Sequence, residues 1–164
     1  MKEITKIDYL NVENLIDQKD YIISMMMESW EISFPNDFDK EVKVRARYKS
    51  LVEYIMLKKA RVLAAIRDDK IIGILWYFTK NSSIYHVNQL VVSEKARRLG
   101  VGSKLMNTLT KEAKKEGIDE IELFVSKANM GAKKFYDNHG FEVERIINHG
   151  FEVERILMRR NIDD

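Results

Sequence analysis

The spacing of apolar positions in the first 58 residues predicts one strand followed by two helices. Residues 3–9 alternate between polar and apolar side chains, as a strand with one buried face does. Residues 20–29 carry several large apolar side chains on one helical face. Residues 30–38 hold the only proline and three aromatic side chains, which predicts a structured loop. Asp39 then stands where the N-cap of a second helix is expected, and that helix reaches about Lys58.

The rest of the chain predicts mostly extended segments around two further helices. The paired aspartates 68 and 69 separate two strands and predict a hairpin. The strongest helical pattern ends at Gly117, a residue suited to a helix C-terminus. The strands are expected at 60–67, 70–79, 84–92 and 119–125, the helices at 100–116 and 127–138, and two strands at the end. This order predicts a single mixed α/β domain over residues 1–164, antiparallel in its first half.

A tandem repeat lies near the C-terminus. The nine residues NHGFEVERI at 138–146 recur unchanged at 148–156, so that the units 138–147 and 148–157 are expected to form the last two strands. In the first copy Asn-His-Gly should end a helix, and in the second it should turn a hairpin at 148–150. A three-residue turn there would place Glu144 opposite Glu154, a mildly destabilising pair.

Composition excludes several classes of chemistry. The chain has no cysteine, which rules out disulfides, a thiolate nucleophile and cysteine-based metal sites. Its three histidines form no HExxH motif, so no metal is expected. No apolar run is long enough to span a membrane and the N-terminus is too polar for a signal peptide, so we expect a cytoplasmic protein with no membrane partner.

The charges are unevenly distributed, although the net charge is only +2. Residues 11–39 contain seven acids and one lysine, whereas residues 95–134 contain ten bases and five acids. This asymmetry is consistent with a polyanionic ligand on one side and a cationic ligand on the other, or with two solvated faces. The lysines of the helix at 100–116 are typical of a solvated helix face, and no nucleic-acid partner is expected.

A glycine-rich turn joins an apolar strand to the amphipathic helix that begins near Gly100. Glycines here allow close backbone approach, and the free N–H groups of the helix N-terminus attract phosphate. The alternative is a tight turn that needs glycine for steric reasons alone. A Walker loop is absent, and a dinucleotide fingerprint would need glycine where Leu105 stands and an acid at the end of the next strand.

The chain resembles the GNAT superfamily of acyl-CoA-dependent N-acyltransferases. The resemblance rests on R-x-x-G-x-G at Arg97–Gly102 after the strand HVNQLVV, and on a second motif about 30 residues downstream: Asn129, Ala132, Phe135-Tyr136 and Gly140-Phe141. It implies a mostly antiparallel sheet of about seven strands with a splayed parallel pair, flanked by about four helices.

The resemblance also implies how acetyl-CoA is bound. The backbone of the central strand would pair with the pantetheine arm, here at Leu90, Val91 and Val92. The turn would hold the pyrophosphate through backbone amides and basic side chains, here at Arg97, Arg98, Leu99, Gly100, Val101, Gly102 and Ser103. Asn129 would contact the cofactor arm. Tyr136 would lie near the sulfur and protonate the departing thiolate, the alternative being a core aromatic residue.

The implied reaction is direct transfer of an acetyl group from acetyl-CoA to a primary amine of a small molecule or peptide. His86 lies where histone-acetylating members carry a glutamate that serves as the general base. It is either the general base of this chain or a structural histidine. Glu28, Glu31 or Asp37 could instead bind or deprotonate a cationic amine. A backbone N–H near Val92 would meet the oxyanion. A non-catalytic acyl-CoA-binding or regulatory module is the alternative function, and a homodimer is possible by analogy.

Overall fold

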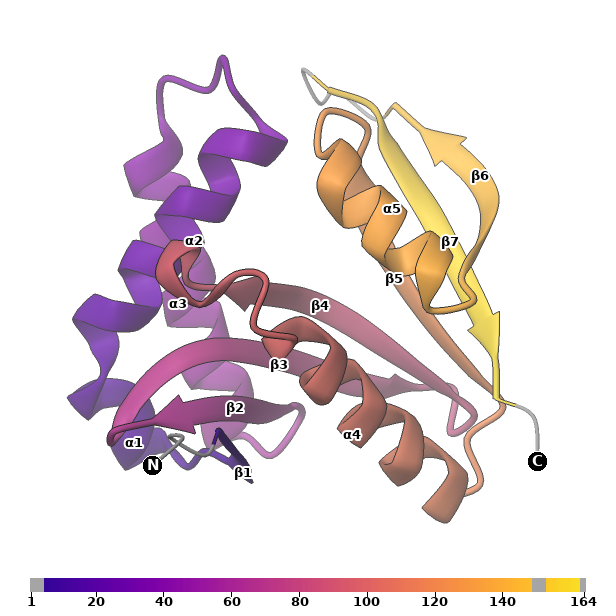
Figure 1. The fold of residues 1–164 in the computed structure, drawn as a ribbon, viewed down its shortest axis with the longest axis horizontal. Helices are drawn as coiled ribbons and strands as arrows, with labels where there is room; N and C mark the ends of the chain where they lie inside the picture. Colours follow the sequence, from indigo (N-terminus) through magenta and orange to yellow (C-terminus); the bar gives the residue numbers. More distant parts are fainter. Residues whose placement is uncertain (1–4, 149–152, 163–164) are drawn as a thin grey trace.

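The strands of the described chain form one mixed sheet. The computed structural model describes residues 5–148 and 153–162, and within them seven strands lie in the order β1-β2-β3-β4-β5-β7-β6. Neighbouring strands are antiparallel except β4 and β5, which confirms the mixed sheet with a parallel pair (Figure 1). The strands are β1 (Lys6–Tyr9), β2 (Arg61–Arg67), β3 (Lys70–Lys80), β4 (Ile84–Val92), β5 (Glu120–Ser126), β6 (Glu142–Ile147) and β7 (Arg155–Asn161).

Helices cover both faces of this sheet. They are α1 (Val12–Asp17), α2 (Lys19–Ser33), α3 (Lys40–Met56), a short 3₁₀ turn η1 (Glu94–Ala96), α4 (Val101–Lys115) and α5 (Met130–Asn138). None of the helices in the described ranges is long and apolar enough to cross a membrane.

The N-terminal helices differ from the expected pattern at two places. The short helix α1 was not predicted; it begins with a reciprocal cap in which Asn11 and Asn14 each accept the other's backbone N–H, at 2.8 and 3.1 Å. The loop predicted to start at Trp30 is wrong for its first four residues, because α2 continues to Ser33. The helix ends there because Phe34 precedes a proline, which disfavours helical backbone.

Alternating side chains of the central strands feed two separate cores. On β2, Leu63 and Ala65 pack with α4 and α5, while Val62 and Ala64 pack against α1, α2 and α3. Figure 1 shows the three N-terminal helices on one side of the sheet and α4 on the other. Both faces of β2, β3 and β4 are therefore buried, which fixes the register of the strands that approach the site.

The two copies of the repeat adopt different structures. Ile147 pairs with Arg155, and among the described residues of the second copy (148 and 153–156) only Arg155 and Ile156 lie in a strand. The expected pairing of Glu144 with Glu154 is therefore wrong: Glu144 lies at a bulge, 2.6 Å from Arg159. The hairpin turn expected at 148–150 falls largely outside the described residues. Local context decides this difference, since the first copy follows a helix and closes it at Gly140 with φ of 82°.

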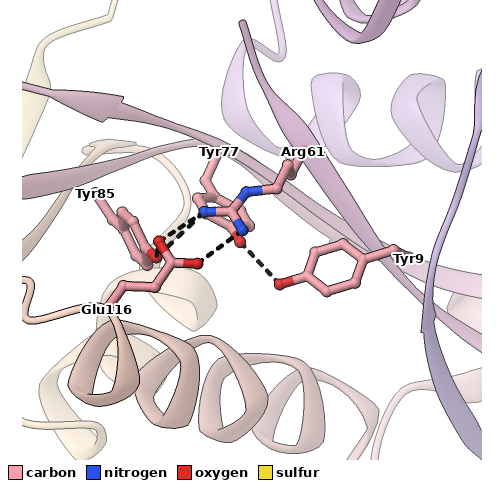
Figure 2. Close-up of polar contacts among 5 residues, drawn as sticks. All are labelled: Tyr9, Arg61, Tyr77, Tyr85 and Glu116. Atoms are coloured by element: carbon pink, nitrogen blue, oxygen red, sulfur yellow. Dashed lines mark hydrogen bonds and ion pairs between the residues drawn. The ribbon is translucent and has the colours of Figure 1, made fainter. Parts of the chain in front are cut away.

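A polar cluster ties the sheet to the end of α4 (Figure 2). Arg61 donates two hydrogen bonds to Glu116, at 2.8 and 2.9 Å, and Tyr85 donates to the same carboxylate. The guanidinium of Arg61 also lies over the ring of Tyr77, whose hydroxyl is 3.0 Å from that of Tyr9. The hydrogen bonds from Arg61 are the main reason that the pKa of Glu116 lies below its ordinary value. The cluster therefore links four strands to one helix.

Replacement of Glu116 by glutamine should lower the free energy of unfolding at neutral pH by roughly 1 kcal/mol, a small value because solvent screens a half-exposed pair. The side chains of Arg61 and Glu116 are 42% and 36% exposed. Because the folded-state pKa is lowered, this contribution is complete above about pH 4.5 and is lost as the pH falls through the lowered pKa. Urea unfolding across the acid range measures it, with the exposed Glu53→Gln as control. A difference that does not shrink in acid would contradict this account.

Candidate active site

The parallel pair of β4 and β5 holds together for only four residues on each strand. Pairing runs from Ile84↔Glu120 to Val87↔Leu123 and then stops within the described chain, although both strands continue. Asn88 forms a bulge at this point, because its two neighbours pair with consecutive residues of β3. Figure 1 shows the two strands diverging beyond it. Residues 88–92 therefore present backbone N–H and C=O groups on the side that β5 has left.

Two adjoining cavities occupy the space between the diverging strands. The strand cavity, about 290 Å³, is lined by the facing ends of β4 and β5 and by side chains of α2, α3 and β7. The helix cavity, about 380 Å³, lies beside the end of β4, the first turn of α4 and α5. Five residues line both: Ser29, Leu90, Asn129, Ala132 and Tyr136. A ligand in one cavity can therefore meet a ligand in the other at this shared boundary.

The turn before α4 is built for close approach to an anion. Arg98 and Gly100 both have left-handed backbone, with φ of 70° and 74°, and α4 begins directly afterwards. A Cβ on Gly102 would lie 3.3 Å from two ring atoms of Phe135, so that glycine lets α4 and α5 pack closely. The first N–H groups of α4 have no partner within the helix and carry its partial positive charge. Together with Arg97, which lines the helix cavity, these N–H groups have the charge and geometry that suit an anion.

Tyr136 and Asn129 lie at the boundary of the two cavities. The ring of Tyr136 packs edge-on against Phe135 and Phe141, and burial raises the pKa of its phenol. Asn129 caps α5 by accepting a hydrogen bond from the backbone N–H of Ala132 at 3.1 Å. Its amide nitrogen also donates to the hydroxyl of Ser33 on α2, at 3.3 Å. Both predicted residues therefore line the two cavities and are held in place by contacts with neighbouring elements.

His86 lies on the wall of the strand cavity, largely buried between two aromatic rings. The centroid of its ring is 5.0 Å from that of Phe78 and 5.6 Å from that of Phe124. Burial lowers its pKa, although the carboxylate of Glu122, with an oxygen 3.7 Å from Nδ1, acts in the opposite direction. Glu122 is buried and also accepts a hydrogen bond from Lys80, at 3.0 Å. The imidazole is thus neutral at neutral pH and able to accept a proton.

Comparison with known protein families gives the same family as the resemblance carried by the sequence motifs. The acetyltransferase (GNAT) family model matches residues 22–141, well over half of the chain. The chain belongs to the GNAT acetyltransferase family. An uncharacterized N-acetyltransferase of Methanocaldococcus jannaschii is 33% identical over 64 residues, 39% of this chain and 28% of that protein. Mycothiol acetyltransferase of Brachybacterium faecium is 28% identical over 89 residues, 50% of this chain and 26% of that protein. The chain thus aligns with about a quarter of the length of each.

Solved structures show the same GNAT fold over nearly the whole chain. The PaiA N-acetyltransferase of Thermoplasma acidophilum, in complex with coenzyme A, has a TM-score of 0.81 and 23% identity, over 96% of this chain and 99% of that one. The ribosomal-protein-S18-alanine N-acetyltransferase of Escherichia coli has a TM-score of 0.77 and 17% identity, over 98% of this chain and 96% of that one. At these identities the likeness shows the GNAT fold alone.

Glu28 and Glu31 were expected to contact a cationic substrate, but neither residue lines the strand cavity or the helix cavity. Glu28 accepts the backbone N–H of Glu94 at 2.9 Å, and one of its oxygens is 3.8 Å from Arg97. Glu31 forms an ion pair with Lys40. Asp37, the third acid considered, accepts hydrogen bonds from Lys43 and from the indole of Trp30, with the bond from Lys43 the main cause of its lowered pKa. All three therefore have partners within the chain.

The described residues offer no group of three or more histidine, aspartate or glutamate side chains placed to hold a metal ion. Ser103, expected among the pyrophosphate ligands, lies with its hydroxyl 3.1 Å from the ring nitrogen Nε2 of His139. That contact joins the first turn of α4 to the end of α5. Ser103 is therefore available to a ligand chiefly through its backbone N–H.

Sequence reasoning missed two arginines that line the strand cavity, Arg47 on α3 and Arg155 at the start of β7. A signal existed for Arg47, because it lies three residues after Val44 and four before Leu51, both fully buried. A charged residue on the apolar face of a predicted helix is a candidate for function. Arg155 had no such signal, and its counterpart in the first copy of the repeat, Arg145, is exposed.

The two glycines of the turn should respond differently to alanine. Gly100→Ala should lower the free energy of unfolding by roughly 1–2 kcal/mol, because its left-handed backbone strains any Cβ even in open space. Gly102→Ala should cost about 1–3 kcal/mol through overpacking against Phe135. Gly131→Ala is the matched control: its Cβ meets nothing closer than 4.0 Å, and alanine should stabilise α5. Urea unfolding measures all three, and a Gly100→Ala variant as stable as the control would refute the backbone argument.

Proposed function

We propose that this chain transfers the acetyl group of acetyl-CoA to a primary amine of a small molecule or peptide, by direct attack of the amine in a ternary complex. The observation that carries the proposal is the boundary between the cavities. An anion-binding turn opens onto one, a buried neutral imidazole lines the other, and Tyr136 lines both. Membership of the GNAT family supports acetyl-CoA as the donor.

The chain's residues fit coenzyme A in the helix cavity. Acetyl-CoA supplies a thioester whose carbonyl carbon accepts the nucleophile. The unpaired edge of β4 at Leu90, Val91 and Val92 can hydrogen-bond an extended pantetheine arm as an added strand would. The left-handed turn and the first N–H groups of α4, at residues 99–103 with Arg97 and Arg98, can hold the pyrophosphate. Asn129 adds an amide at the boundary with the strand cavity.

In this proposal His86 removes the proton of the acceptor amine, directly or through a water molecule. An alkylammonium group has a pKa near 10 and must be deprotonated before its nitrogen can form the new C–N bond. His86 is neutral at neutral pH and lines the cavity opposite the donor. The bulge at Asn88 places an unpaired stretch of backbone next to the boundary, so we expect the N–H that meets the carbonyl oxygen within 88–90 rather than at Val92.

Tyr136 acts on the leaving group: its hydroxyl donates a hydrogen bond to the sulfur as the C–S bond breaks and coenzyme A leaves as a thiolate. Burial raises the pKa of its phenol, so the hydroxyl is fully protonated under physiological conditions. The same shift makes complete proton transfer to a thiolate less favourable. We therefore assign Tyr136 mainly to hydrogen-bonding the negative charge that develops on sulfur, a role that a buried and undissociated phenol performs well.

Calorimetric titration with acetyl-CoA, with NADH as control, tests the cofactor assignment, and release of free thiol in the presence of amines tests transfer.

Tyr136→Phe should reduce kcat roughly 10- to 100-fold while acetyl-CoA affinity is unchanged, because only the hydroxyl is lost. The exposed Tyr21→Phe is the matched control. Saturable acetyl-CoA binding without turnover of any amine would instead identify a non-catalytic acyl-CoA-binding module.

The acid limb of the pH profile should report His86. Its pKa is lowered from 6.5, so kcat/KM should rise as the pH increases through this lowered value and should gain nothing further from His86 above it. His86→Gln should lower kcat and remove this limb, because the imidazole assigned to it is then absent. Initial rates between about pH 5 and 9 measure it. An unchanged acid limb in His86→Gln would assign the base to another group.

A further inference from the structure

The strand cavity has a marked positive charge. Its lining includes Arg47 and Arg155, and no aspartate or glutamate is among the described residues that line it. The other polar side chains on its wall are neutral, including Asn88, Ser126 and the imidazole of His86. A small cavity whose charged groups all have one sign favours a ligand of the opposite sign.

Arg47 reaches this cavity from α3 and is positioned by neutral groups. It donates from Nη1 to the amide oxygen of Asn88 at 2.7 Å, and its guanidinium carbon lies 5.5 Å from the centroid of the Trp30 ring. A guanidinium has five N–H donors in a planar fork, and this bond uses one of them. Burial, followed by the charge of Arg155, lowers the pKa of Arg47. The Arg47 side chain is thus held in place by these contacts, is partly removed from solvent, and lines the strand cavity.

Arg155 enters the same cavity from the opposite wall. Its guanidinium carbon lies 4.7 Å from the centroid of the Phe124 ring on β5, and burial lowers its pKa. It acts electrostatically on Arg47, so the two side chains are close enough to act on one ligand. An anionic group bound between them would interact favourably with both guanidinium groups.

We propose that the acceptor amine of this chain carries an anionic group, a carboxylate or a phosphate, and that Arg47 and Arg155 bind it while the amine faces His86. The inference rests on the proposed function and names its substrate class. Paired guanidinium groups suit both anions because each can accept parallel hydrogen bonds from a fork. The acids that suggested a cationic substrate, Glu28 and Glu31, lie outside this cavity.

Matched probe amines test the charge requirement. Alanine, β-alanine and γ-aminobutyrate are each compared with the corresponding primary amide, and phosphoethanolamine is compared with ethanolamine. We expect kcat/KM at least about tenfold higher for the anionic member of one pair, mainly through KM. The preferred pair identifies carboxylate or phosphate and the span from amine to anion. Equal or better turnover of every uncharged partner overturns the proposal.

Variants of each arginine assign the preference to these side chains. Arg47→Gln and Arg155→Gln should each remove most of the preference for the anionic probe, measured as the ratio of its kcat/KM to that of its uncharged partner in the same variant. Loss of the hydrogen bond between Arg47 and Asn88 affects both probes alike, whereas loss of the anion contact affects only the anionic one. Arg47→Lys should restore part of the preference. The exposed Arg45→Gln, on the same helix, is the control. Melting temperatures without substrate verify folding, and a preference that survives both glutamine variants overturns the assignment.

A binding measurement separates this inference from failure of the proposed reaction. Calorimetric titration of the chain, in the presence of coenzyme A, compares N-acetylalanine with N-acetylalaninamide and N-acetylphosphoethanolamine with N-acetylethanolamine. Tighter binding of the anionic member, lost in Arg47→Gln, supports the anion site even where no amine is acetylated. Equal binding within both pairs refutes the site even where uncharged amines are acetylated.

Discussion

The structure depends on the parallel pairing of β4 and β5, which stops part-way along both strands. Four residues of β4 and β5 pair, and the strands then separate although both continue. Unpaired backbone inside a protein is costly, so such an edge persists only where another group satisfies it. A parallel pair fits this purpose because both strands run in the same direction, and their free ends face each other across one space. The cavities, the proposed cofactor edge and the boundary at Tyr136 all follow from this divergence.

The open end of the strand pair is braced by residues that also line the site. The hydroxyl of Ser126 on β5 donates to the backbone carbonyl of Ser33 at 2.5 Å, and Asn129 donates to the Ser33 hydroxyl. On the other wall Arg47 reaches Asn88 at the bulge. These contacts hold α2 and α3 at a fixed distance from the diverging strands. The polar side chains that brace the strands thus also line the strand cavity, which places the candidate site on a supported frame.

The sequence predicted those parts of the fold whose signals are local. The strands, α4 and the turn at Gly100 follow from alternation, amphipathicity and backbone freedom, and the family motifs pointed to Asn129 and Tyr136. The sequence did not predict the cap of α1, because Asn14 stands where a glutamate or glutamine is usual. The β6–β7 register also escaped, because identical segments carry identical patterns and only their neighbours distinguish them. Arg47 could have been found as a charge on an apolar helix face, but its proximity to Arg155 is a purely tertiary fact.

The acidic segment at 11–39 and the charged side chains that line the strand cavity have opposite signs. Three of the seven acids at 11–39 have partners elsewhere in the chain: Glu31 pairs with Lys40, Asp37 pairs with Lys43, and Glu28 accepts a backbone N–H. An exposed carboxylate with a nearby cation contributes little field inside a cavity, because solvent screens it. Solvent screens a half-buried guanidinium on an aromatic ring far less, and Arg47 and Arg155 both line the strand cavity in this way. The proposed preference for an anionic acceptor therefore rests on the few charges that line the cavity, not on the many in the sequence.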